Sequence, residues 1–568
     1  MFKDNRFKGL TPNDLKNDLV AGITVGVVAI PLGMAFAIAS GVNPEYGIYT
    51  TIIAGLIVAL FGGSRFQIAG PTGAFIPILL GIVLQYGYED LLIAGFLAGI
   101  LLMIMSFFKL GSLISYIPRS VTIGFTSGIA VIIFSGQIEN FLGVEDVEKK
   151  EYFHQNMMEI VNNIDTINLF SIIVALIGFA SVIIVPKIFP RVPVLLVALI
   201  IPTIASLLIF PGKVATIGTA FGGISQALPS FSLPEFTFDK LLYLWQPAFV
   251  IAMLGGIESL LSAVVADGMT GKQHQSNKEL FGQGLANIIT PLFGGIPATG
   301  AIARTATNIK SGAVSPWSGV FQSVFVLLTL LLFAPYASHI PLASMAPILM
   351  VVAYNMSEIK SFAHIVKLRS GDSLVLITTF LLTVFVNLTV AVPVGLLLAI
   401  ISFVKRASTA LEVNNYTMNK LEANPTESEL KANECPEIAS FTIQGPLFFG
   451  AADRFESALI HSINERPSVL ILKMRYVPII DATAEANLSA LIKDFVNLGG
   501  TVLITELPKE PLKMLQKSGL YDEIGEEYFF EPTTDAIDYA FEIVDVQKCP
   551  RCSREGATSC QAFQKTKD

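Results

Sequence analysis

The sequence predicts a helical membrane protein that crosses the bilayer many times and ends in a small α/β domain. Three observations predict this fold class. The 568-residue chain is 52% hydrophobic and only 14% charged, with a mean hydropathy of +0.63, whereas about 25% of the residues in soluble domains are charged. Apolar runs of membrane length recur between Leu19 and Phe403. After Arg406 they give way to short strand-like and helical runs in alternation.

Residues 1–408 are predicted to form a transmembrane transport domain with up to fourteen spans. The chain begins with a polar segment, and the apolar run after it has no small-residue cleavage site, so we expect the first span to be retained. An even number of spans places most Lys and Arg residues on the side of the termini. Because positive residues are enriched in cytoplasmic loops, we expect both termini in the cytoplasm.

The third span contains an interruption. The stretch "FQIAGPTGAFIPILLG", Phe66 to Gly81, is apolar enough for a membrane, yet Gly70, Pro71 and Gly73 disfavour a continuous helix. We expect an extended segment that enters from the cytoplasm and a helix that begins near Thr72 at mid-membrane. Irregular backbone at that depth must be buried in protein or line a cavity.

A weak internal repeat relates the two halves of this domain. The motif "PTGA" at Pro71–Ala74 resembles "ATGA" at Ala298–Ala301, an offset of 227 residues. The same offset carries Ile30–Gly41 onto Ile257–Gly268, where Ile, Ala and Gly recur in register. Chance similarity between Gly- and Ala-rich helices is the alternative. We interpret the pattern as an inverted repeat of two seven-span halves, as in many transporters.

In an inverted repeat, the second interrupted helix enters from the opposite side of the membrane. We therefore expect residues 295–298 to be extended and a helix to begin near Thr299. Two helix N-termini would then face each other at the bilayer centre. Each presents unpaired backbone N–H groups and the positive end of a helix dipole, an arrangement that binds anions.

Two charged residues fall inside the predicted spans near these helix ends. Arg304 follows Thr299 by about one turn, and a charge at that depth is expensive and indicates a functional site. Its guanidinium could hold an oxyanion by paired hydrogen bonds, or it could form a structural ion pair. Glu258 lies mid-span with Ser262 one turn later on the same face. It is either a proton- or cation-coupling carboxylate or a permanent partner of Arg304.

The region after the last span divides into three parts. Residues 409–435 read as a polar linker and residues 436–545 as a small α/β domain. Residues 546–568 form a tail with three of the four cysteines. Disulfides are disfavoured in the cytoplasm, and Cys549, Cys552 and Cys560 are one ligand short of a closed zinc site. We therefore expect neither a metal nor another cofactor.

The sequence lacks the motifs of several functional classes. The sequence contains neither GxxxxGK[ST] nor HExxH, so nothing indicates ATP-driven transport or zinc hydrolysis. It also contains no basic arm or stripe, so nucleic-acid binding is not expected. We do not expect an enzyme.

The segment "GGIESLLSAVVADGMTGKQHQSNKELFGQGLANIITPLFGGIPATGAIARTATNIKSGAVSP", Gly255 to Pro316, resembles the signature region of the SulP, or sulfate permease, family of anion transporters. The similarity extends over nearly the whole chain, down to a C-terminal STAS domain. The resemblance implies a fourteen-span, seven-plus-seven inverted repeat of the uracil-permease type, with core and gate parts. It also implies an elevator-like movement of the core and a homodimer. We expect the protein to lie in a bacterial cytoplasmic membrane.

The resemblance also implies site residues by position. The coupling carboxylate of the family falls on Glu258, with Ser262 beside it. Its substrate site falls on Thr72, Gly73, Gly300, Ala301 and Arg304.

Two departures from the family pattern affect the expected substrate and coupling ion. Many members have a Pro-Gln pair and a Tyr where this chain reads "IPLGMAF", so Leu32 and Phe36 remove polar contacts and weaken the case for sulfate. Relatives that import bicarbonate with sodium place Asp and Thr where Glu258 and Ser262 stand, and they lack an Arg at position 304. Proton coupling is therefore favoured over sodium coupling.

The STAS domain departs from a related phosphorylation site. In bacterial anti-sigma-factor antagonists, a phosphorylated serine follows the Asp that corresponds to Asp481. Here Ala482 takes that place, although Thr483 is adjacent. We therefore interpret this domain as a docking and dimer-supporting module, which could also bind a cytoplasmic protein partner.

These arguments predict a secondary active inorganic anion transporter of the sulfate or bicarbonate class, with proton-coupled symport. Within the class, a C4-dicarboxylate/proton symporter and an anion exchanger are the alternatives. From another class, the alternative is an anion channel or sensor that signals through the STAS domain.

Overall fold

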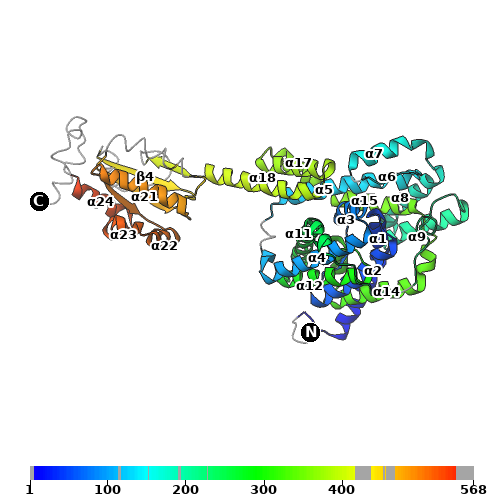
Figure 1. The fold of residues 1–568 in the computed structure, drawn as a ribbon. Coiled ribbons are helices and arrows are strands. Elements are labelled where there is room, and N and C mark those ends of the chain that lie inside the picture. Colours follow the sequence, from blue (N-terminus) through cyan, green and yellow to red (C-terminus); the bar gives the residue numbers. More distant parts are fainter. Residues whose placement is uncertain are drawn as a thin grey trace. The chain divides into compact units, whose positions relative to one another are not determined.

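The computed structural model describes residues 6–112, 117–150, 152–189, 193–226, 228–415, 437–451, 455 and 467–544. The chain divides into two compact units, Met1–Ala399 and Ile400–Asp568, and Figure 1 traces their elements in sequence order. All four cysteines lie outside the described residues, so the prediction for the cysteines of the tail lies outside them too.

The first unit is helical and built for a membrane. Within the described ranges, nine helices are long and apolar enough to cross a bilayer by length and composition, and three further apolar helices have 10–17 residues. The prediction of a protein with many apolar membrane helices is confirmed. The count of fourteen spans stays a prediction.

A first helix group includes the long helix α11 (Phe238–Thr270). Helix α4 (Tyr88–Phe107) packs on α11 and on α12 (Ser276–Ile289). Helices α1 (Pro12–Ala39) and α2 (Pro44–Phe61) pack on each other and on α14 (Trp317–Ala337). These six helices are called the first helix group below.

A second helix group is formed by five other helices. Helix α5 packs on α15 and α17, and α8 packs on α9 and α15. The bounds are α5 (Arg119–Gly136), α8 (Leu169–Ile188), α9 (Val194–Ile209), α15 (Leu342–Met356) and α17 (Gly371–Phe385). Helix α18 (Leu388–Thr409) continues from the first unit into the second. The shorter connecting helices are α6 (Ile138–Leu142), α7 (Phe153–Asn162), η3 (Ile164–Thr166), α10 (Ile217–Phe221), η4 (Thr290–Phe293) and α16 (Ile359–Lys367).

The two interrupted segments meet in a short antiparallel pair of strands. Strand β1 (Ala69–Gly70) pairs with β2 (Thr299–Gly300), with Ala69 opposite Gly300 and Gly70 opposite Thr299. Beyond β1 the chain forms the 3-10 helix η1 (Gly73–Phe75) and then α3 (Ile76–Tyr86). Beyond β2 it forms α13 (Ile302–Lys310). We call this meeting of β1 and β2, with the residues that flank them, the crossing.

The predicted helix starts are partly right. Thr72 is the N-cap of η1, as expected. The start near Thr299 was wrong by three residues, because Thr299 and Gly300 are extended in β2 and Ala301 is the N-cap of α13. The Ala301 N–H donates to the Ile68 carbonyl at 2.8 Å. The helix begins later because Thr299 and Gly300 pair with β1, about 230 positions earlier in the chain. Sequence periodicity does not reveal such a pairing.

The second unit contains a five-stranded sheet in the order β3-β4-β5-β6-β7. Strand β3 is antiparallel to β4 and the other neighbours are parallel. The strands are β3 (Glu412–Asn415), β4 (Ile438–Gln444), β5 (Val469–Tyr476), β6 (Thr501–Thr505) and β7 (Phe529–Phe530). The helices are α21 (Ala482–Asn497), α22 (Lys509–Ser518), α23 (Leu520–Ile524), η5 (Glu526–Tyr528) and α24 (Thr533–Ile543).

Alternating residues of β5 build two cores, one on each face of this sheet. Leu470 and Leu472 pack with Leu488 of α21, whereas Val469 packs with Ile537 of α24. The predicted alternation of strands and helices after residue 467 is confirmed. Strand β3 lies inside the segment that we predicted as a linker. Its sequence is polar, and it forms a strand because it pairs with β4 at the edge of the sheet. The helical run "ADRFESALIHSIN", residues 452–464, falls almost wholly outside the described residues.

Candidate functional site

The crossing brings four of the predicted site residues together. Thr72 and Gly73 open the helical segment η1, and Gly300 and Ala301 precede α13 on the antiparallel partner. Thr72 is 6% exposed and Ala301 7% exposed. Among the described residues, no side chain caps the start of η1 or of α13. The first-turn N–H groups of both helices therefore lack side-chain acceptors.

Arg304 reaches across the crossing from the first turn of α13. The residue is 2% exposed, and its Nη2 donates to the carbonyl oxygen of Pro71 at 3.0 Å. The guanidinium carbon lies 5.9 Å from the centre of the Phe36 ring, within the range of a cation–π contact. These two contacts fix one arm and one face of the guanidinium.

The other arm of Arg304 is unpaired. Its Nη1 is buried and has no hydrogen-bond partner in the part of the chain that the structure describes. A Cβ atom built on Gly70 would lie 2.6 Å from this nitrogen, so only glycine leaves room for it. A buried, charged donor without a partner is costly unless a ligand satisfies it. The arrangement can hold an anion beside two helix N-termini.

Glu258 joins the crossing from α11. One carboxylate oxygen accepts a hydrogen bond from Thr72 Oγ1 at 2.9 Å. Within the described ranges no ion pair joins Glu258 to Arg304, so the structure does not show the permanent salt bridge that was the alternative. The carboxyl group is instead tied to the N-cap residue of η1.

Ser262 has a different setting from the one we expected. Its buried Oγ donates to Thr305 Oγ1 at 3.1 Å, and Thr305 Oγ1 accepts from the Ile68 N–H at 3.1 Å. Ser262 therefore attaches α11 to the crossing, and its hydroxyl bonds Thr305 rather than a group beside Glu258.

Sequence reasoning missed Ser259. This residue is 0% exposed, and its Oγ accepts from the Gly300 N–H at 3.0 Å and bonds Thr299 Oγ1 at 2.8 Å. Its backbone carbonyl accepts from Gln67 Nε2 at 3.1 Å. The spacing of Ser259 and Ser262 on one face of α11 is the signal that could have identified both as contacts of the crossing.

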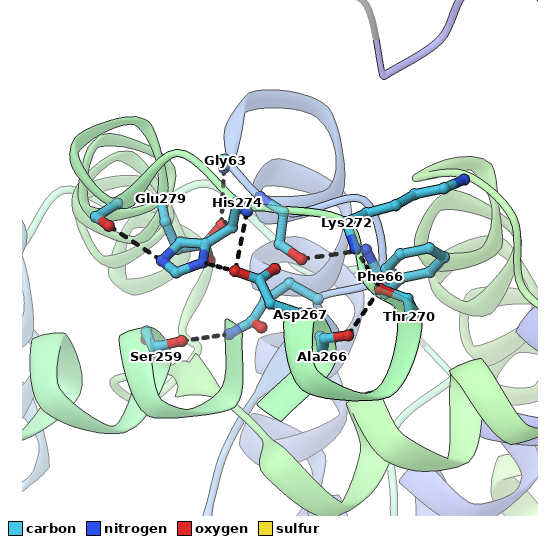
Figure 2. Close-up of polar contacts among 12 residues, drawn as sticks. Gly63, Phe66, Ser259, Ala266, Asp267, Thr270, Lys272, His274 and Glu279 are labelled. Atoms are coloured by element: carbon cyan, nitrogen blue, oxygen red, sulfur yellow. Dashed lines mark hydrogen bonds and ion pairs between the residues drawn. The ribbon is translucent and has the colours of Figure 1, made fainter. Parts of the chain in front are cut away.

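The cytoplasmic end predicted for α11 carries a second polar cluster (Figure 2). Asp267 accepts from the backbone N–H of His274 at 3.1 Å and lies 2.6 Å from its Nδ1. Nearby, the buried carboxylate of Glu279 accepts from the Gly63 and Ser64 N–H groups. Asp267 thus lies in the last turn of α11, which ends at Thr270. In the ranges described, no three His, Cys, Asp or Glu residues form a metal site.

Comparison with known proteins identifies the family. The model of the "Sulfate permease family" matches residues 15–379, and that of the "STAS domain" matches residues 429–537. The chain belongs to the sulfate permease family.

Relatives of this sulfate permease chain cover nearly its whole length. It is 53% identical over 526 residues to the Bacillus subtilis (strain 168) protein named "Putative sulfate transporter YvdB", covering 93% of this chain and 98% of that protein. It is 30% identical over 526 residues to "Bicarbonate transporter BicA" of Picosynechococcus sp., covering 90% and 92%. The solved structure of murine Slc26a9, an anion transporter, matches with a TM-score of 0.82 at 19% identity, covering 94% and 92%. That likeness shows the fold. The protein is a membrane transporter and not an enzyme.

Proposed function

We propose that this protein is a secondary active anion transporter that holds its substrate at the crossing, between the first turns of η1 and α13. The observation that carries the proposal is the buried, unpaired Nη1 of Arg304 beside two helix starts. Backbone N–H groups and the helix dipoles favour a negative charge there. The proposed site is lined by Thr72, Gly73, Gly300, Ala301 and Arg304. The N–H groups of Gly300 and Ala301 already bond Ser259 and Ile68, so the donors on this side are the first-turn N–H groups of α13 and the Arg304 guanidinium.

The substrate class that fits is a small oxyanion. A guanidinium arm and two sets of N–H groups suit oxygen acceptors spread around one centre. The names of the relatives, which include sulfate and bicarbonate transporters, support an inorganic anion. Phe36 lies over the guanidinium where the family pattern has a polar residue, which favours bicarbonate over sulfate.

Glu258 is the proposed coupling group, and a proton is the proposed coupling ion. An ionised carboxylate bonded to Thr72 repels an anion at the start of η1, whereas a protonated one leaves Arg304 and both helix ends free to hold it. Proton and anion would then load together. Sodium is disfavoured, since Glu258 and Ser262 stand where the relatives that import bicarbonate with sodium have Asp and Thr.

The way in which the substrate crosses the membrane belongs to the same proposal. We propose an elevator movement of the first helix group, which carries the crossing, against the second. We further propose a homodimer in a bacterial cytoplasmic membrane with both termini cytoplasmic. Support for the movement comes from the packing, because each helix group packs mainly within itself, while α1 also contacts α9 and α15.

Uptake into proteoliposomes tests the proposal. Bicarbonate, sulfate and a C4-dicarboxylate are offered at two pH values, and accumulation against a gradient is measured. We expect Arg304→Ala to abolish uptake of the preferred anion and Arg304→Lys to restore little of it, because the two-armed geometry is lost. Near-normal uptake by the Arg304→Ala variant would contradict the site. Saturable accumulation excludes an anion channel, and its absence in the parent protein would favour the channel or sensor alternative.

A further inference from the structure

Two apolar side chains of the second helix group lie directly against the start of η1. A Cβ atom built on Gly73 would lie 3.0 Å from Met356 Sδ of α15 and 3.2 Å from Ile133 Cδ1 of α5. Gly73 is the first residue of η1. The side chains therefore cover the helix start at which the proposed site binds its anion.

The position of these side chains is fixed by contacts between α15 and α5. Ile133 is 2% exposed. Ser127 Oγ of α5 donates to the carbonyl oxygen of Ser357, the residue after Met356, at 2.6 Å. Glu358 then adopts a left-handed conformation with φ of 41°, which is rare for a residue other than glycine. A strained backbone conformation such as that of Glu358, next to a proposed site, is typical of a functional constraint.

We propose that Met356 and Ile133 are specificity-determining residues that form an apolar wall of the anion site. This inference rests on the proposed function. Neither a thioether nor an aliphatic group can donate a hydrogen bond to an anion. An anion at Gly73 would thus receive donors from the crossing and none from the wall.

The wall discriminates by hydration. A dianion such as sulfate is hydrated far more strongly than a singly charged anion, because the solvation energy of an ion rises with the square of its charge. Against an apolar wall, sulfate therefore loses more hydration free energy than the hydrogen bonds of the site restore. The site should therefore prefer a weakly hydrated, singly charged oxyanion such as bicarbonate or nitrate.

Matched substitutions at Met356 test the wall. Met356→Gln keeps the length of the side chain and adds an amide donor, whereas Met356→Leu keeps the wall apolar. Sulfate and nitrate uptake are measured in proteoliposomes. For each anion, the uptake that remains in the Arg304→Ala variant is subtracted. We expect Met356→Gln to raise the sulfate-to-nitrate ratio about tenfold, the low end of the effect of one hydrogen bond to a charged group, and Met356→Leu to leave the ratio unchanged.

A second pair keeps the test independent of any folding defect at Met356. Ile133→Thr adds a hydroxyl, and Ile133→Val is its apolar control. Ile133→Thr should raise the same ratio and Ile133→Val should not. Uptake could depend on Arg304 while neither Met356→Gln nor Ile133→Thr changes the ratio relative to its control. That result would contradict the apolar wall and leave the proposed function standing. If Arg304 is dispensable for uptake, the proposed function fails, and the wall fails with it.

Discussion

Gly70 lies beside the unpaired arm of the Arg304 guanidinium. Gly70→Ala would place a Cβ atom 2.6 Å from Nη1 and push the free arm away from the site. Because one hydrogen bond to a charged group contributes about 1.5–3 kcal/mol, we expect anion affinity to fall at least roughly tenfold. Gly81→Ala is the matched control, since a Cβ atom there meets nothing within 4 Å. Equal affinities of the two variants, measured by calorimetry on folded protein, would show that the free arm does not bind the substrate.

Glu258 carries the coupling prediction. Glu258→Gln imitates the protonated carboxyl and still accepts a hydrogen bond from Thr72, so we expect anion exchange across the membrane to persist. Accumulation driven by a pH gradient should be lost. In the parent protein, uptake should rise as the external pH falls, because protonation removes the negative charge beside the site. A Gln variant that concentrates substrate as well as the parent would make Glu258 a structural residue.

At the residue scale, the sequence could predict what is chemically conspicuous. Arg304 and Glu258 stand out as charges in apolar runs, and Pro71 marks the break. Met356 could not be predicted, because its role depends on a contact with Gly73, which is distant in the chain. The spacing of Ser259 and Ser262 indicates a shared helix face, but it does not reveal that Ser259 bonds Gly300. A methionine in an apolar helix has no local signal that separates a wall from ordinary packing.

At the element scale, α11 holds the crossing through Ser259. Ser259→Ala leaves the Gly300 N–H buried without its acceptor, which costs about 1–3 kcal/mol of the free energy of unfolding. Ser323→Ala is the control, because Ser323 is also buried and, among the residues that the structure describes, its hydroxyl bonds only the Gly319 carbonyl, one turn earlier in its own helix. Thermal unfolding in detergent should show the larger loss for Ser259→Ala, with a parallel loss of anion affinity. Identical melting temperatures for the two variants would argue against the role of Ser259 as a tie to the crossing.

The elements themselves were predictable to different degrees. Long apolar helices and the strand–helix alternation of the second unit follow from hydropathy and periodicity. The two interruptions follow from Gly and Pro. Strand β2 and the late start of α13 do not, because a two-residue strand exists only through its partner. Strand β3 escaped prediction for the same reason.

At the scale of the whole molecule, the proposed site lies entirely in the first unit. Each site residue, and each contact described for it, falls within Met1–Ala399. Deletion of residues 410–568 should therefore leave the dissociation constant of the anion unchanged in the folded remainder. A purified protein that ends at Thr409 is compared with the full chain by the same calorimetric measurement. A loss of affinity above about tenfold in folded protein would show that the second unit helps to build the site.

The pairing of β1 with β2 has a consequence for biosynthesis. Gly70 meets Thr299, so about two hundred residues must be synthesised after the first strand before its partner exists. Until then, the extended backbone around Gly70 has unpaired N–H and C=O groups in a lipid environment, which membranes tolerate poorly. The nascent chain must keep this segment in the translocation machinery, or shielded by neighbouring helices, until the second half arrives. The anion site is thus among the last parts of the transport unit to form. A chain whose synthesis ends before residue 299 lacks the site.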